Sequence, residues 1–215
     1  MKEKNKLIIS IAAVVAMVIA VVGATYAYWT WASANNERTL VNFTVDLGLT
    51  ATLDGGTISV SRLAPTSSCT NSTYSTKAPV TLNYSNNSGA PAIATGTLTV
   101  TQFTVQSGRS AFPTNALTHL HYALTTSSSS CTTGAITSGT FSGKGSNGSV
   151  LFTDTVLQNN IATGTTNGSK NMWLYVWLDD GYTFQNVGSE AVQDPMQDLQ
   201  IILTWSGKIT NQPTS

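Results

Sequence analysis

The chain has 215 residues, of which 9% are charged and 41% are hydrophobic, and its formal net charge is zero. This balance excludes a polyelectrolyte tail and a disordered acidic chain. No basic stripe is present that could hold phosphates, so we expect no nucleic-acid partner, and no cofactor is expected either. A chain of this size can bury a full core as one domain.

Residues 1–27 have the pattern of an export signal. The basic head Met1–Lys6 precedes an apolar run from Leu7 to Ala24, and small residues follow. Such a segment prefers lipid to water. We therefore expect a hydrophobic N-terminal helix, acting as signal peptide or membrane anchor, and we expect the rest of the chain to be exported.

Cleavage and retention of this helix are alternatives. The eighteen positions of the run reach roughly 27 Å, slightly less than a hydrocarbon core of about 30 Å. Small residues such as Thr25 and Ala27 suit cleavage between Ala27 and Tyr28. The length of the run and the nearby aromatic residues favour a membrane anchor that holds the rest of the chain on the outer side of the membrane. We favour cleavage, so that residues 7–24 contact the membrane at least before processing.

After an N-terminal arm at 28–39, the region 40–215 has the period of half-buried strands. The expected strands are 40–47, 57–63, 79–84, 92–105, 117–125, 135–141, 149–156, 171–179 and 199–205. Asp54-Gly55-Gly56 predicts a turn. Short strands at turn-bounded intervals predict an all-β fold, a two-sheet antiparallel sandwich of the jelly-roll type.

Two expected strands have unusual patterns. The apolar face of 92–105 switches near Gln102, which predicts a β-bulge. Segment 171–179 is apolar on both faces, with Trp173, Tyr175 and Trp177 on one of them. Such a strand is central and covered twice, or it leaves one face for a partner subunit; we favour the first. The polar segments 126–134 and 142–148 are expected on the surface.

Several segments resemble the TasA/camelysin family of exported Firmicute proteins. They are Gly23-Ala-Thr-Tyr-Ala27, Leu63-Ala-Pro65, Val80-Thr-Leu-Asn-Tyr-Ser-Asn-Asn-Ser-Gly89, Leu174-Tyr-Val-Trp-Leu-Asp-Asp180 and Asp198-Leu-Gln-Ile-Ile-Leu-Thr-Trp205. The resemblance implies cleavage by a dedicated signal peptidase and a jelly-roll subunit of biofilm fibres. It also implies that the freed arm completes the sheet of a neighbour by strand addition.

The composition of the N-terminal arm favours its pairing with another subunit. Its aromatic residues Tyr28, Trp29 and Trp31 are unfavourable in water, and no charge follows until Glu37 and Arg38. We therefore expect an exported cell-surface or matrix structural protein that associates with itself or with other surface proteins. A membrane-anchored adhesin or carbohydrate-binding module, using exposed tryptophans for stacking, is an alternative from another class.

Cys69 and Cys131 both lie in polar, serine-rich segments of an exported chain, where a disulfide can persist. We expect a structural bridge, with free or intermolecular thiols as the alternative. A catalytic cysteine is not expected, because no neighbouring cation would lower the pKa of either thiol.

His119 and His121 would share one side of a strand, a spacing that can chelate a metal. Camelysin was named as a metalloprotease, so the resemblance implies a possible peptidase. No His-Glu-x-x-His helix is present, however, and a hydrolytic zinc site needs three protein ligands with a carboxylate. We interpret both histidines as surface residues, and we expect no enzyme.

The acidic residues near the end of the chain could in principle bind Ca²⁺ from loops between two strands. They are Asp179, Asp180, Glu190, Asp194 and Asp198. Their spacing matches no EF-hand loop, so a solvated acidic loop is the preferred interpretation.

Overall fold

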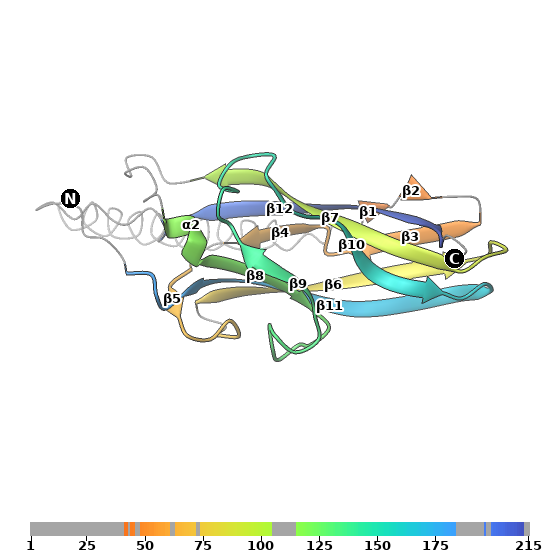
Figure 1. Cartoon of the computed structure of the whole chain (residues 1–215), viewed down its shortest axis with the longest axis horizontal. Coiled ribbons are helices and arrows are strands. Elements are labelled where there is room, and N and C mark those ends of the chain that lie inside the picture. The colour runs from red at the N-terminus through yellow and green to blue at the C-terminus, as the bar shows by residue number, and fades with distance from the viewer. Residues whose placement is uncertain are drawn as a thin grey trace, which may run out of the picture. The chain divides into compact units, whose positions relative to one another are not determined.

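The computed structural model describes residues 41–42, 44–45, 48–60, 63–71, 74–104, 115–183, 196 and 199–212. All of them belong to one compact unit, Arg38–Ser215. Their strands form two sheets, and the predicted all-β, two-sheet fold is confirmed (Figure 1). The expected N-terminal helix, the cleavage site at Ala27 and Tyr28, and the arm lie outside the described residues. Within the described ranges, no helix has the length and apolar character needed to cross a membrane.

The first sheet has seven strands, and its central strand is β11 (Thr165–Asp179). Its path is β1 (Val41–Asn42), β3 (Leu49–Asp54), β6 (Ser75–Asn86), β11, β8 (Leu120–Thr125) and β9 (Ala135–Thr140). The short β5 (Pro65–Thr66) pairs in parallel with the end of β11. One helical turn, α2 (Ala116–His119), precedes β8.

The second sheet has five strands. Its order is β10 (Val150–Ile161), β7 (Ala92–Thr104), β12 (Gln200–Asn211) and β2 (Thr44–Val45), and β4 (Thr57–Val60) also pairs with β12. The β2 and β4 strands contact different parts of the same side of β12, β2 in parallel and β4 antiparallel.

The core lies between the two sheets, because alternate residues of each strand point to the same face. Val80 and Leu82 of β6 and Leu203 of β12 are fully buried in it. Burying such a side chain contributes about 1.5 to 3 kcal/mol each. The apolar residues that alternate along the sequence thus form the inward face of each strand.

The bulge predicted near Gln102 is confirmed. Ile202 of β12 lies opposite Gln102, but the next residue, Leu203, lies opposite Val100, so Thr101 is the extra residue. The Thr101 hydroxyl donates to the Ile202 carbonyl at 3.1 Å. The extra residue lets Val100 and Phe103 both face the core despite their odd spacing.

The turn at Asp54-Gly55-Gly56 is also confirmed, but it does not form a hairpin. Residue 54 ends β3 in the first sheet, while residue 57 begins β4 in the second. Gly55 has φ +92°, and a Cβ there would lie 2.6 Å from the Pro79 carbonyl oxygen. Glycine therefore lets the chain cross between sheets against the backbone of β6.

Several expected boundaries were wrong. The segment 40–47 is not one strand, because β1 pairs with the first sheet and β2 with the second. Segment 117–125 starts in the helical turn α2, and its strand begins only at Leu120. The strands β6, β10, β11 and β12 are longer than expected. Their polar ends stay paired because long neighbouring strands satisfy their backbone groups.

Candidate functional site on the outer face of the first sheet

The two apolar faces of β11 are both covered. Met172, Leu174, Val176 and Leu178 point into the main core and are fully buried. On the outer face, Tyr175 is also fully buried, and Trp173 and Trp177 pack around it. The interpretation of 171–179 as a central strand covered twice is confirmed, because β11 lies between β6 and β8.

The outer cover is the polar segment 126–134, here called the serine loop. The Tyr175 hydroxyl donates to the Ser127 carbonyl at 3.2 Å, and Lys77 of β6 donates to the Ser128 carbonyl. The Thr125 hydroxyl donates to the Ser130 carbonyl at 3.1 Å. The expectation that this segment only lies on the surface was incomplete. Its backbone carbonyls accept hydrogen bonds from the sheet, so a polar loop can cover an aromatic strip.

A disulfide fixes the cover in place. Cys69 and Cys131 are joined, with an S–S distance of 1.98 Å and a Cα–Cα distance of 6.3 Å, as the sequence predicted. Both cysteines pack in the small outer cluster with Tyr175. For a sequence separation of 62 residues, the chain-entropy model gives a stabilisation of about 4 kcal/mol.

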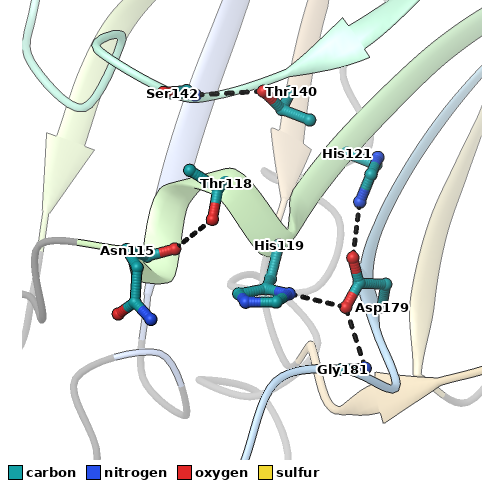
Figure 2. A network of polar contacts seen from close by, with 8 residues as sticks. All are labelled: Asn115, Thr118, His119, His121, Thr140, Ser142, Asp179 and Gly181. Atoms are coloured by element: carbon teal, nitrogen blue, oxygen red, sulfur yellow. Dashed lines mark hydrogen bonds and ion pairs between the residues drawn. The ribbon is translucent and has the colours of Figure 1, made fainter.

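Next to this cover, Asp179 accepts hydrogen bonds from both histidines of the chain (Figure 2). His119 Nδ1 lies 2.8 Å from Oδ1, and His121 Nε2 lies 2.7 Å from Oδ2. The Gly181 amide adds a third bond to Oδ1 at 2.9 Å. This His–Asp–His cluster joins α2, β8 and the end of β11.

The cluster favours an ionised carboxylate. Partial burial acts to raise the pKa of Asp179, but the hydrogen bonds from His121, His119 and Gly181 and the charge interaction with His119 outweigh it. The net pKa lies below its ordinary value. In a neutral ring whose Nε2–H donates to Asp179, Nδ1 of His121 has no proton and is a hydrogen-bond acceptor.

The histidine interpretation needs correction in two respects. His119 ends the helical turn α2 rather than lying on a strand. The two side chains are 29% and 28% exposed, so they are partly buried rather than free surface residues. Their shared partner was not predicted from the sequence, because it depends on the β11–β8 pairing, which sets Leu178 opposite Leu120 and brings Asp179 beside His119.

Of the residues considered as metal ligands, the structure describes His119, His121, Asp179 and Asp180. Within the described ranges, no group of three or more histidine, cysteine, aspartate or glutamate residues is placed to hold a metal ion. Asp180 is exposed beside the cluster. Glu190, Asp194 and Asp198 lie outside the described residues, so a calcium site there stays an open prediction.

A shallow groove of about 350 Å³, here called the β9 groove, lies beside the cluster on the outer face of β8 and β9. His121 stacks on Trp177 along one wall, with ring centroids 5.1 Å apart and planes 16° apart. The small, fully buried Ala123 also lines it. Further lining residues come from the serine loop and from β9: Cys131, Thr132, Ser138 and Thr140.

A scan against models of known protein families finds no match to this chain, and a search of curated proteins finds no related sequence. The resemblance to the TasA/camelysin family therefore rests only on the segments quoted from the sequence.

Proposed function

We propose that this chain is an exported structural protein of the cell surface or extracellular matrix, which assembles with copies of itself by strand addition. The export part is supported by the leader pattern of residues 1–27 and by the Cys69–Cys131 disulfide, since disulfides persist in oxidising compartments. The proposal includes the TasA-like character and the jelly-roll topology. The crossings between sheets from β3 to β4 and from β7 to β8 support that topology.

The observation that carries the assembly part is the edge strand β9. Within the described ranges it pairs only with β8, and its six residues include no charge and no proline. An edge of this kind is a template for another strand. The edge strand β10 of the second sheet is less suitable for strand addition, because it has four register irregularities and positive φ at Asp154 and Asn160.

The pairing pattern identifies the free groups on β9. The Phe141 amide donates to the Leu120 carbonyl at 2.9 Å, so this pair is hydrogen-bonded. Alternation along an antiparallel ladder then directs the N–H and C=O of Ser138 and Thr140 away from β8. These groups are the expected partners of an added strand.

The segment we propose for that position is the arm of a second copy, starting at Tyr28. Its aromatic residues Tyr28, Trp29 and Trp31 are uncharged, as is β9. Pairing would remove an apolar segment from water and satisfy backbone groups of both strands. If the leader is retained instead, the domain is a tethered surface module.

Light scattering and electron microscopy across a concentration series test the proposal. We expect concentration-dependent polymers from the processed chain, and only monomers when residues before Glu37 are deleted. Ser138→Pro, which removes an N–H that points away from β8, should also abolish polymers. The matched control is Thr153→Pro on the irregular edge strand β10, provided that circular dichroism confirms its fold. Monomers at every concentration, with and without the arm, would refute assembly.

A further inference from the structure

We infer that the β9 groove binds an uncharged saccharide ring. The groove shares Ser138 and Thr140 with the proposed assembly edge but uses different groups, because their side chains line the outer face of the sheet whereas their free N–H and C=O groups point sideways. Its walls come from one continuous stretch, β8, the serine loop and β9, and from Trp177 of β11.

The walls are held in place before any ligand arrives. His121 is fixed by its 2.7 Å bond to Asp179 and by its stack on Trp177. At the other end, Cys131 is tied to Cys69 by the disulfide. A site whose walls are already ordered loses little entropy when it binds, which favours even a small ligand.

The chemistry of the lining selects the ligand class. None of the ten residues around the groove is aspartate, glutamate, lysine or arginine. A charged ligand would lose hydration there without an opposite charge to pair with. The nearest carboxylate, Asp179, already accepts bonds from His119, His121 and Gly181. An uncharged ligand is therefore favoured.

Aromatic rings and hydroxyl groups occur together in the groove, and this combination suits the binding of a sugar ring. The stacked rings of His121 and Trp177 offer an apolar surface to the C–H face of a pyranose. Thr132, Ser138 and Thr140 carry hydroxyls that can both donate and accept. The groove volume of about 350 Å³ falls within the range of about 300 to 1,000 Å³ for small-ligand sites.

Calorimetric titration and tryptophan fluorescence of the protein recovered from its native surface test this inference. The probes are three neutral trisaccharides: maltotriose, cellotriose and N,N′,N″-triacetylchitotriose. We expect saturable binding of at least one of them. Thr140→Val keeps the shape of the side chain but removes its hydroxyl, and should weaken binding about fivefold to tenfold. The matched control Thr153→Val, on the exposed surface of β10, should leave binding unchanged.

Three outcomes would overturn the inference. They are the absence of saturable binding by all three sugars, equal binding by the wild type and Thr140→Val, and binding of the aromatic peptide Ala-Trp-Ala in place of every sugar. The last outcome would reassign the groove to a protein side chain. Because each titration is read at a concentration where scattering reports monomers, loss of polymer formation would not affect it, and the two proposals can fail separately.

Discussion

The Asp179 carboxylate accepts a 2.7 Å hydrogen bond from Nε2 of His121, on the neighbouring strand β8. Because the histidine bonds and the Gly181 amide hold the pKa of Asp179 below its ordinary value of 3.8, folding favours its ionised form. This contribution is present above the ordinary pKa and is lost as the pH falls through the lower pKa of the folded state.

We predict that Asp179→Asn lowers the free energy of unfolding by about 1 to 2 kcal/mol near neutral pH. The difference from the wild type should shrink as the pH falls below 3.8 and vanish once the folded-state carboxylate is protonated. Urea denaturation at a series of pH values measures it. The control is Asp154→Asn, whose exposed ion pair with Lys208 should contribute less than about 0.5 kcal/mol. A constant difference between wild type and variant across the pH series would contradict this prediction.

Gly55→Ala should destabilise the domain by about 2 to 4 kcal/mol. The residue has φ +92°, and its new Cβ would lie 2.6 Å from the Pro79 carbonyl oxygen. Gly89→Ala is the matched control, since a Cβ at Gly89 meets nothing within 4 Å. Thermal unfolding of both variants measures the effect. Similar midpoints for the two would mean that the crossing at residues 54–56 is not constrained as described.

Asn86→Ala should also lower the stability of the domain, because the Asn86 side chain is fully buried and both its amide group and its oxygen are hydrogen-bonded. Its amide group donates to the carbonyls of Ala90 at 2.9 Å and Ile161 at 2.8 Å, and its oxygen accepts from the Ser88 amide at 2.9 Å. Removal takes this partner away from the Ile161 carbonyl in a buried position, and we expect a loss of about 2 to 4 kcal/mol. Asn83→Ala, on the exposed face of the same strand, should change stability by less than about 0.5 kcal/mol in the same chemical denaturation assay.

Replacing both Cys69 and Cys131 by serine should lower the free energy of unfolding by about 4 kcal/mol. The serine loop would then be held only by hydrogen bonds, so Trp173 and Trp177 should become more accessible. Denaturant titration and acrylamide quenching of tryptophan fluorescence measure the two effects. Wild-type stability in the double variant would show that the loop needs no covalent tie.

Period-two alternation was sufficient to predict the fold class and the bulge near Gln102, because each depends on which face a side chain takes. The strand 171–179 was recognisable because both of its faces are apolar. The positions of strand ends were less predictable. Residues 165–170 of β11 are mostly polar, and they pair because β6 offers its backbone beside them.

The candidate site depended on contacts that no local pattern contains. The serine loop looks like solvent-exposed sequence, and only the sheet below explains why its carbonyls face inward. In the same way, Asp179 was grouped with nearby acids in sequence, whereas its partners are His119 and His121, about sixty residues away. Partner choice across a sheet depends on register, which single-sequence patterns do not specify.

The parallel pairing of β2 with β12 determines how the domain would bear mechanical load. Thr44 and Val45 lie beside Lys208 and Ile209 in the same direction, so tension between the N-terminal and C-terminal sides pulls the two strands lengthwise past each other. In this shear geometry the bonds between them are loaded together rather than opened one by one. A protein pulled from both ends would therefore bear part of that load in shear at the junction between its second and last strands.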